Sequence, residues 1–397
     1  MRGSGRAGLA FRHGLVIGKF YPPHAGHHFL IRSAAEACER VTVVVMAADV
    51  ESIPLAARMS WVRQAHADRP GVTVVGVMDN LAVDYESADA WAGHVALMRA
   101  GIAQAQAPAQ SGVGVAVGAN AGAAVAVSVA VDAVFTSEDY GAELARRFGA
   151  ADVRLDASRG TYAMSGTKVR ADPIAAWTAL EPPVRGWFAK RVVVVGAEST
   201  GTTTLSMDLA DALRARGGPH ALTRWVGEYG RELTVRKLAV ARALAGVRGL
   251  PEPTVFDLDW DDDDFVAVAQ RQCVEEDAAA EAGGPVLVCD TDALATTVWQ
   301  ERYRGRVTGA VWRVARRMPP RALYVLTDHR GVGFDDDGFR DGEHLRPWMT
   351  DRFREVLGGA GVRWIEVDGD RAARLERALA AIDEVVAQGW DLAAPLG

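Results

Sequence analysis

The sequence predicts two α/β domains, each built on a doubly wound parallel sheet. Apolar, strand-like runs alternate with amphipathic segments over residues 14–187, and the same alternation restarts at residue 191. This β-α-β order needs crossover connections, which pack helices on both faces of a parallel sheet. A length of 397 residues also exceeds what a single hydrophobic core usually supports. We place the boundary just after a Pro-Pro pair, which gives domains of residues 1–187 and 188–397.

The hydrophobic pattern locates most elements of the first domain. Buried strands are expected at Leu15–Gly18, Val41–Met46, Val72–Val77 and Val131–Phe135. Amphipathic helices are expected at His27–Glu39, Ala57–His66 and Asp89–Ala105. Residues 104–130 consist almost wholly of Ala, Gly and Val with polar interruptions, so we interpret them as a low-complexity insertion and not as a membrane helix.

The composition is typical of a soluble globular protein and argues against several classes of function. Hydrophobic residues make up 49% of the chain and charged residues 24%. A net charge of −7 disfavours a general nucleic-acid-binding surface. The three cysteines (Cys38, Cys273 and Cys289) are scattered, which indicates a reducing, cytoplasmic setting without structural zinc. We expect no membrane association, and the sequence leaves open whether copies of the chain form a homo-oligomer.

Residues 18–28, GKFYPPHAGHH, carry the strongest functional signal. An apolar strand runs into this segment, and an amphipathic helix follows it. The free N–H groups and the dipole at a helix N-terminus favour phosphate. His24 and His27 lie three residues apart, so both can donate to one polyphosphate from the first turn. A loop with incidental histidines is the alternative, but the combination favours a nucleotide site.

The second half opens with the layout of a phosphate-binding loop. The buried strand Arg191–Val195 leads into GAESTGTTT at residues 196–204, and an amphipathic helix follows to about Arg216. Backbone N–H groups of such a loop form a nest for phosphates. The expected loop residues are Gly196, Ser199, Gly201, Thr202, Thr203 and Thr204, with Thr203 at the position that holds Mg²⁺. A glycine-rich turn without nucleotide is the alternative.

Thr202 stands where such loops carry a lysine that contacts the β and γ phosphates. The loss of one charged donor at developing negative charge costs roughly 3–4 kcal/mol, or about a hundredfold in rate. Another cation must therefore substitute, or this half is slow, or it only binds nucleotide. The candidate substitutes are Arg231, Arg340 and Arg346.

Three later segments support a kinase-like second half. The strand Val286–Asp290 ends in acids, and Asp290 and Asp292 suit Mg²⁺ or an acceptor hydroxyl, or else cap a helix. Glu228 follows a strand expected at Ala221–Trp225 and is either a base, a ribose ligand or a surface acid. Residues 333–347 are rich in Gly, Asp and Arg, as in a mobile arginine-bearing lid, although a plain surface loop has the same composition.

The acidic run at Asp257, Asp259 and Asp261–Asp264 surrounds Trp260. Such runs usually mark a solvated turn or a helix N-terminus, and a helical pattern follows this one. A substrate role is the second interpretation. In that case Trp260 would stack on a flat ring, and the acids would face a positively charged pyridinium.

The first motif resembles the signature of the nucleotidyltransferase superfamily, whose second signature is Ile-Ser-x-Thr-x-x-Arg. Residues 164–170, MSGTKVR, match that signature with Met for Ile. A nucleotidyltransferase half followed by a P-loop half resembles the bifunctional NadR-type NAD-salvage proteins. Further segments fit this resemblance: residues 134–141, 228–231, 290–292 and 337–340. The chain has too few residues before its first strand for the helix-turn-helix domain of some members.

The resemblance implies nicotinamide-mononucleotide (NMN) adenylyltransferase activity in a Rossmann-like first half and ribosylnicotinamide kinase activity in a P-loop second half. It implies ATP, NMN, ribosylnicotinamide and NAD as ligands, and Mg²⁺ as the ion that accompanies ATP. The positions that it assigns in the first half are His24 and His27 with Gly18, Lys19, Phe20, Ser165, Thr167 and Arg170 for ATP, and Trp91 for nicotinamide stacking or core packing.

The insertion and Thr202 depart from the family pattern. Two alternative functions remain open from the sequence. In one, the P-loop half is a regulatory module that binds nucleotide without catalysis, which Thr202 favours. In the other, the first half adenylylates or cytidylylates a different phosphate acceptor such as phosphopantetheine, which the fused kinase-like half disfavours.

Overall fold

The computed structural model describes residues 9–106, 130–156, 160–161, 163–335, 338–340 and 342–396. Most of the low-complexity insertion and parts of the expected lid lie outside these residues. The chain forms two compact units. The second unit spans Arg185–Gly389, and the first contains the preceding residues together with the segment from Trp390 onward. That last segment was expected in the second domain, but its backbone hydrogen bonds are made with a loop of the first unit.

The described part of the first unit contains a five-stranded parallel sheet in the order β3-β2-β1-β4-β5. The strands are β1 (Phe11–Gly18), β2 (Cys38–Ala47), β3 (Val72–Met78), β4 (Ala133–Thr136) and β5 (Ala151–Arg154). The helices that connect or follow them are α1 (Ala25–Ala37), α2 (Leu55–Ala65), α3 (Ala88–Gln106), α4 (Gly141–Phe148) and α5 (Gly166–Ala171). The division between the two units falls within α6 (Pro182–Phe188).

Helices cover both faces of this sheet, as the continuous apolar strands require. Neighbouring residues of β1 point into different cores: Leu15 packs in one cluster and Val16 in the other. In β2, Val44 and Val43 divide in the same way, and all four side chains are at most 1% exposed. The doubly wound fold predicted for this half is confirmed.

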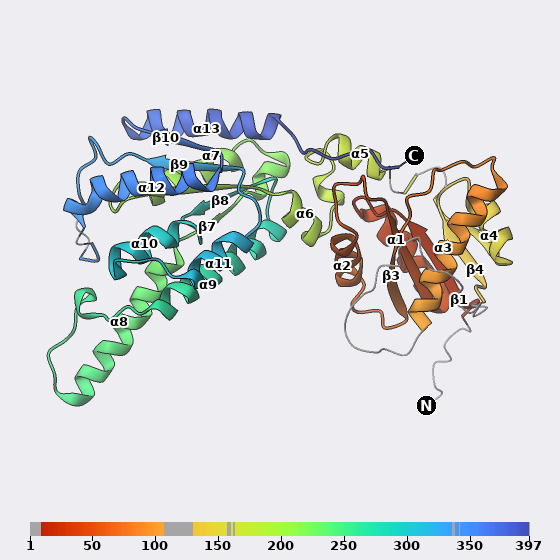
Figure 1. Ribbon diagram of the computed structural model, residues 1–397, viewed down its shortest axis with the longest axis horizontal. Coiled ribbons are helices and arrows are strands. Elements are labelled where there is room, and N and C mark those ends of the chain that lie inside the picture. The colour runs from red at the N-terminus through yellow and green to blue at the C-terminus, as the bar shows by residue number, and fades with distance from the viewer. Residues whose placement is uncertain are drawn as a thin grey trace. The chain divides into compact units, whose positions relative to one another are not determined.

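The described part of the second unit contains another five-stranded parallel sheet, in the order β10-β9-β6-β8-β7. Its strands are β6 (Lys190–Gly196), β7 (Arg224–Val226), β8 (Val286–Asp290), β9 (Leu323–Thr327) and β10 (Trp364–Val367). Its helices are α7 (Thr202–Arg214), α8 (Tyr229–Arg248), α9 (Asp262–Ala282), α10 (Ala295–Arg304), α11 (Gly309–Arg317), α12 (Arg346–Ala360) and α13 (Arg371–Ala387) (Figure 1).

One predicted strand of this unit is wrong in its extent. Residues 218–222 form a short 3-10 helix, and β7 covers only three residues after it. Gly217 and Gly218 both have positive φ, and Pro219 follows them, so the chain turns here before it can extend. Further 3-10 turns lie at residues 177–179, 255–257 and 343–345.

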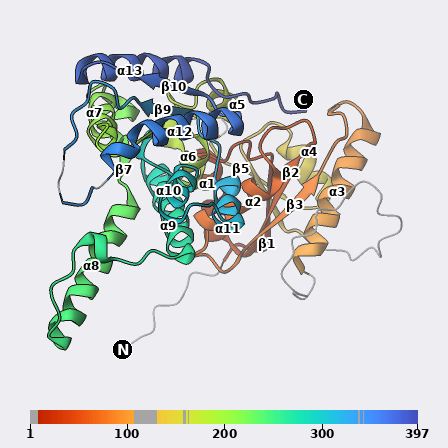
Figure 2. The same cartoon turned by 60° about the vertical axis from the view of Figure 1, so that its left-hand side comes forward.

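The topology determines where functional groups gather. β1 and β6 are the central strands of their sheets. After each of them, the chain forms the two strands on one side of the sheet and then the two strands on the other side. Ligands of such sheets bind beyond the carboxyl ends of the strands, near this reversal. The histidine motif follows β1 and the glycine-rich loop follows β6. Helix α8, by contrast, extends away from the rest of its unit (Figures 1 and 2). Within the described residues, no helix is both long enough and apolar enough to cross a membrane.

Candidate functional site

The turn between β1 and α1 brings the two motif histidines together. His24 is the N-cap of α1 with an extended backbone, and its side chain makes no capping hydrogen bond to the helix. The ring centroids of His24 and His27 are 3.9 Å apart, and the ring of Phe20 lies 4.7 Å from that of His27. Phe20 itself is 1% exposed and has a positive φ. The aromatic residue therefore fixes one imidazole, which in turn contacts the other.

The second signature closes the same site from the other side. Ser165 caps α5 by accepting a hydrogen bond from the Lys168 N–H. Arg170 donates to the carbonyl oxygen of Tyr21 at 2.6 Å and to Thr167 Oγ1 at 3.3 Å. A Cβ atom at Gly166 would lie 3.0 Å from the Tyr21 oxygen, so glycine permits this close approach. Burial lowers the pKa of Arg170, which keeps its positive charge.

Two cavities meet at this turn. The larger, of about 490 Å³, is lined by Gly18, Lys19, Phe20, His27, Ser165, Thr167 and Arg170 among others. The smaller, of about 90 Å³, contains both His24 and His27. His27 and Ser165 line both cavities. The structure thus brings together all eight residues that the resemblance assigns to ATP in this half.

The far end of the larger cavity is aromatic. Trp91 lines it and is also 7% exposed within the hydrophobic core, so both interpretations of this residue apply. Its indole N–H donates to the carbonyl oxygen of Tyr85 at 3.1 Å. The rings of Tyr85 and Tyr140 are stacked with centroids 6.1 Å apart. Burial raises the pKa of both phenols, so these two side chains are neutral.

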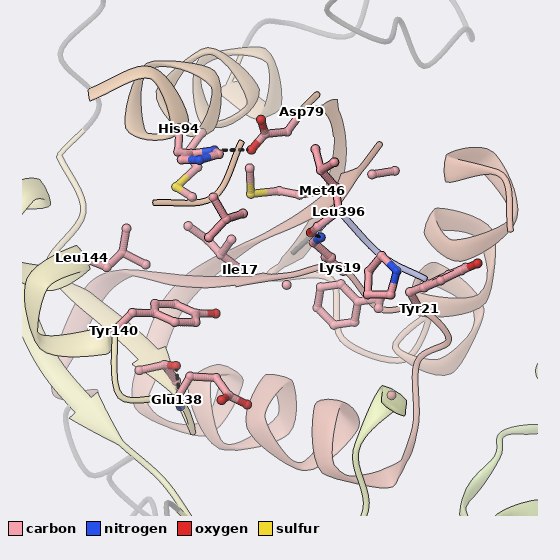
Figure 3. A pocket seen from close by; sticks show the side chains of 18 of the residues that line it. Ile17, Lys19, Tyr21, Met46, Asp79, His94, Glu138, Tyr140, Leu144 and Leu396 are labelled. Atoms are coloured by element: carbon pink, nitrogen blue, oxygen red, sulfur yellow. Dashed lines mark hydrogen bonds and ion pairs between the residues drawn. The ribbon is translucent and has the colours of Figure 1, made fainter. Parts of the chain in front are cut away.

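Polar residues at this end were missed from the sequence. Asp79 directly follows β3, and its carboxylate lies 2.5 Å from Nδ1 of His94 (Figure 3). His94 Nε2 lies 3.2 Å from the carbonyl oxygen of Ala82. Asp84 and Glu138 add further acids to the lining. The rule that ligands bind beyond strand ends would have found Asp79, whereas His94 carries no sequence signal of its own.

In the second unit, the loop after β6 is shaped by glycine and threonine. A Cβ atom at Gly196 would lie 2.2 Å from Thr327 Oγ1, so only glycine fits there. Gly201 caps α7 with a φ of +84°, and Ser199 also has a positive φ. The Thr200 hydroxyl donates to the carbonyl oxygen of Ala197 at 2.7 Å. Ser199, Thr202 and Thr203 line a cavity of about 340 Å³, whereas Thr204 lies outside its lining.

Two acids with raised pKa values lie near this loop: Glu228 lines the cavity, whereas Asp290 does not line it but contacts Thr203, which does. The Asp290 carboxylate is 4% exposed and accepts a hydrogen bond of 2.5 Å from the Thr203 hydroxyl. Burial raises the pKa of Asp290 to about 6, although the threonine hydroxyls oppose this shift. Glu228 is the N-cap of α8 and lines the cavity. Burial and the charge of Asp290 raise the pKa of Glu228 to about 7, so it exchanges a proton near neutrality.

The three candidate arginines are placed differently. Arg231 and Arg340 line the cavity, with Arg231 over the ring of Phe339 and Arg340 at 3.4 Å from Ser199 Oγ. Arg346 is 6% exposed and donates to the carbonyl oxygens of Ser199, His329 and Val332. Arg346 thus shapes the loop from behind and does not face the cavity.

The acidic run has mainly a capping role. Asp261 and Asp264 form a capping box at the start of α9, and Asp257 caps the preceding 3-10 turn. Trp260 lines the cavity, with its ring centroid 6.2 Å from that of Tyr303 and with Lys237 above it. Trp260 therefore lies in the cavity wall, as its expected stacking role requires. Asp257, Asp261 and Asp264 instead stabilise the starts of helical segments.

Asp292 lies in the interior of the second unit and does not line the cavity. Its carboxylate is fully buried and accepts hydrogen bonds from the N–H groups of Leu294 and Ala295. It also accepts one from the Tyr324 hydroxyl at 2.6 Å and pairs with Arg321. Asp292 thus fits the alternative interpretation, in which the acid caps a helix. Its carboxylate already has four donors, so no oxygen is left for a substrate.

Glu198 is a loop residue that the sequence did not single out. Its carboxylate lines the cavity and pairs with Arg302 at 2.6 Å. Its second oxygen accepts the Gly342 N–H at 2.9 Å. The pair is almost fully buried, at 8% and 2% side-chain exposure, so Glu198 joins the loop to α10 and to the segment before α12.

Two family models match parts of the chain. Residues 14–83 match the model of the citrate lyase ligase C-terminal domain, and residues 191–374 match that of an AAA domain. The first match contains the histidine motif, and the second begins in β6 and contains the glycine-rich loop. The two matches agree with the division into a nucleotidyltransferase-like and a P-loop half.

Curated relatives include the trifunctional NAD biosynthesis/regulator protein NadR of Escherichia coli and that of Salmonella typhimurium. Each is 23% identical over 309 residues, which cover 74% of this chain and 63% of the relative. The chain therefore spans under two thirds of the length of these proteins. The resemblance to NadR-type proteins predicted from the sequence is confirmed.

Solved structures show the same fold. A crystal structure of a NadR protein in complex with NR aligns with a TM-score of 0.68 and 19% identity, covering 96% of this chain and 98% of the other. A NadR structure in complex with NAD and AMP-PNP aligns with a TM-score of 0.64 and 20% identity, covering 95% and 97%. The predicted pair of doubly wound domains is confirmed along nearly the whole chain.

Proposed function

We propose that this protein makes NAD in two steps, one in each unit. The second unit phosphorylates ribosylnicotinamide with ATP, and the first transfers an adenylyl group from ATP to the resulting NMN, releasing pyrophosphate. The observation that carries the proposal is the placement of His27 and Ser165 at the junction of two cavities beyond the central strand, with Arg170 in the lining of the larger one. The similarity to NAD-biosynthesis proteins along most of the chain supports the choice of substrates.

Adenylyl transfer needs positioning and charge neutralisation more than a base. An NMN phosphate oxygen attacks the α-phosphate of ATP, and the bond to the bridging oxygen breaks. This nucleophile is already ionised at neutral pH. His24 and His27 would donate to the ATP phosphates, with His27 nearest the charge that grows on the leaving group. Arg170 and Thr167 would hold the rest of the pyrophosphate.

The larger cavity suits the acceptor. Its aromatic end offers Trp91, Tyr85 and Tyr140 to a flat ring, and the neutral phenols do not repel it. Asp79 and Asp84 place acidic groups at the same end. A pyridinium ring carries a positive charge, which these acids stabilise. Lys19 and Arg170 lie on the phosphate side of the cavity, so the charges of this end and that side complement a mononucleotide.

In the second unit, Glu228 is the proposed base. The 5′-hydroxyl of ribosylnicotinamide attacks the γ-phosphate, its proton passes to Glu228, and ADP leaves. A carboxylate with a pKa near 7 suits this role, whereas Asp290 is already engaged by the Thr203 hydroxyl. Trp260 and Tyr303 would face the nicotinamide ring from the aromatic wall.

The hydroxyl of Thr203 and the carboxylate of Asp290 fit Mg²⁺, which prefers oxygen ligands and usually keeps several waters. No group of three or more His, Cys, Asp or Glu side chains suited to a metal occurs in the described residues, so the nucleotide phosphates would complete the shell. The ion, when bound with ATP, neutralises phosphate charge.

The missing P-loop lysine leaves Arg231 and Arg340 as the cations that line this cavity among the described residues. Both guanidinium groups act on the Glu228 carboxylate, and Arg231 also acts on Asp290. We assign the neutralisation of the γ-phosphate to these two arginines. Arg346 has a structural role in the loop.

Chromatography of reactions with ATP, Mg²⁺ and either NMN or ribosylnicotinamide tests the proposal. NAD is expected from both substrates. NAD from NMN alone would remove the kinase step from the proposal. Product from neither would exclude both steps, and a panel with phosphopantetheine and glycerol phosphate would then identify the acceptor.

Thr202 favours a second candidate, in which the P-loop half senses nucleotide without catalysis. Thr202→Lys distinguishes the two. A kinase that uses arginines should gain up to about a hundredfold in phosphorylation when the lysine is restored. A sensing module should show no phosphorylation in either form while still binding ATP.

A further inference from the structure

Residues 390–396 run along the larger cavity of the first unit. This segment follows α13 in sequence, yet it belongs to the first compact unit. Pro395 and Leu396 are part of the cavity lining. Leu396 lies beside Lys19 at the edge of the cavity (Figure 3). A stretch of chain from beyond the second unit thus contributes to a site built otherwise by the first 170 residues.

Three hydrogen bonds form a closed ring, and two of them join this segment to the loops of Tyr21 and Ser52. The Ser52 N–H donates to the Tyr21 hydroxyl oxygen at 2.9 Å, and the Tyr21 hydroxyl donates to the carbonyl oxygen of Ala393 at 2.9 Å. The Ala393 N–H donates to Ser52 Oγ at 2.8 Å. Both backbone groups of Ala393 are therefore used, which fixes the segment in register with the loop after β2.

Tyr21 connects this ring to the phosphate side of the site. Its ring is 2% exposed, and the guanidinium groups of Arg58 and Arg170 lie over it at 4.3 and 5.0 Å from the centroid. Its carbonyl oxygen accepts the hydrogen bond from Arg170. A displacement of Tyr21 would therefore displace Arg170.

Lys19 is held by the same segment. Its ammonium group donates to the carbonyl oxygen of Leu396 and lies 3.4 Å from the Glu51 carboxylate. Glu51 in turn pairs with the fully buried Arg58 at 2.6 Å. The position of the Lys19 charge at the cavity thus depends on the segment and on the loop after β2.

We propose that residues 390–396 are a wall of the acceptor cavity and position Tyr21 and Lys19 for the mononucleotide. The inference rests on the function proposed for the first unit. It assigns a specific site role to a segment outside both nucleotide-binding motifs. Because the segment orients groups and does not touch the reacting atoms, its loss should weaken acceptor binding more than turnover.

Ala393→Pro and Ser52→Ala in the full chain remove the same hydrogen bond from its two ends. Each should raise the KM for NMN about three- to tenfold, which corresponds to one net hydrogen bond, and the KM for ATP should rise with it because Tyr21 also holds Arg170. The kcat of adenylyl transfer should stay within about twofold, and phosphorylation of ribosylnicotinamide should not change. The double variant should be no worse than the single ones, because both changes delete one interaction.

Val50→Ala is the matched control, because Val50 lies in the same loop as Ser52, is 57% exposed and does not line the cavity. It should leave KM for NMN unchanged. Wild-type KM in both Ser52→Ala and Ala393→Pro would overturn the inference, as would a gain in activity, which would mean that the segment obstructs the site. If the wild type itself made no NAD from NMN, the proposed function would fail independently of the segment.

Discussion

His27 is one of the side chains that line both cavities of the first unit, and its ring contacts those of Phe20 and His24. Under the proposed function, an imidazole at this junction would donate to the bridge between the α and β phosphates of ATP. At the scale of single residues, the adenylyl transfer proposed for the first unit therefore depends strongly on one hydrogen-bond donor.

His27→Ala should lower kcat of adenylyl transfer by about 10²–10³-fold, the usual loss for one preorganised donor at developing charge. Phosphorylation of ribosylnicotinamide should persist, because His27 belongs to the other unit. Separate assays of the two steps check this. Retention of more than about a tenth of adenylyl transfer would contradict the role of His27.

Glu228 predicts the pH profile of the second unit. Its pKa is raised to about 7, so the folded protein favours the protonated form, and the ionised base disappears as the pH falls below 7. The kcat/KM of phosphorylation should therefore fall about tenfold per unit below pH 7 and level off above it.

The same assay with Glu228→Gln checks the assignment. That variant should be slow at every pH and should lose this dependence on pH. Asp257→Asn, which changes an exposed acid that caps a 3-10 turn, should keep the wild-type profile. A wild-type profile that is flat between about pH 5.5 and 7 would exclude Glu228 as the base.

At the scale of elements, the strands that the sequence predicted with nearly correct positions are those with a buried apolar stretch. β1, β2, β3, β4, β6 and β8 each contain at least four consecutive buried residues. β5 and β10 are edge strands of four residues with polar side chains, which no apolar pattern separates from a loop. β9 is fully buried, and its five residues carry the same signal as the predicted strands.

Site residues divide in the same way. Motif residues were predicted because phosphate chemistry restricts both residue type and spacing, as in residues 18–28 and 196–204. Residues such as His94, Glu198 and Ala393 reach their sites through tertiary contacts with distant elements. Asp292 shows the converse. Its position after a strand suggested that it binds a ligand, but its carboxylate is bonded to the buried Arg321 and Tyr324.

Gly196 offers a test of packing at the end of β6. In Gly196→Ala the new methyl group would lie 2.2 Å from Thr327 Oγ1 and 2.6 Å from Thr200 Oγ1, which forces the loop away from β9. Overpacking of this kind costs about 1–3 kcal/mol in free energy of unfolding. Urea unfolding followed by tryptophan fluorescence should show the loss.

Gly358→Ala is the matched control, because Gly358 lies in α12 and a methyl group added there would have no atom within 4 Å outside the backbone of its own helix. That change should stabilise the protein by about 0.5–1 kcal/mol. Equal effects of the two substitutions would show that the space around Gly196 is not restricted.

At the scale of the whole molecule, the proposed product of the second unit is the substrate of the first. Each unit has its own sheet, its own core and its own candidate nucleotide-binding loop. Nothing in this chemistry requires that NMN pass directly between the sites, so the steps should be separable.

A mixture of His27→Ala and Glu228→Gln proteins should therefore make NAD from ribosylnicotinamide, although neither variant does so alone. NMN should appear first in solution, and NAD should follow after a lag that shortens as total protein increases. Time courses by chromatography measure both. Failure of the mixture, with each variant active in its remaining step, would indicate transfer without release.

The ring formed by Tyr21, Ser52 and Ala393 has a consequence for the order of biosynthesis. The ribosome makes Tyr21 and Ser52 early, but Ala393 emerges only after all of Arg185–Gly389 has been translated. At about 5–20 residues per second, this delay is on the order of ten seconds or more. The sheet of the first unit can form during that interval, but Pro395 and Leu396, which line its cavity, are synthesised last. Translation that stops within the second unit therefore leaves Lys19 and Tyr21 without the carbonyl oxygens of Leu396 and Ala393 that accept their hydrogen bonds.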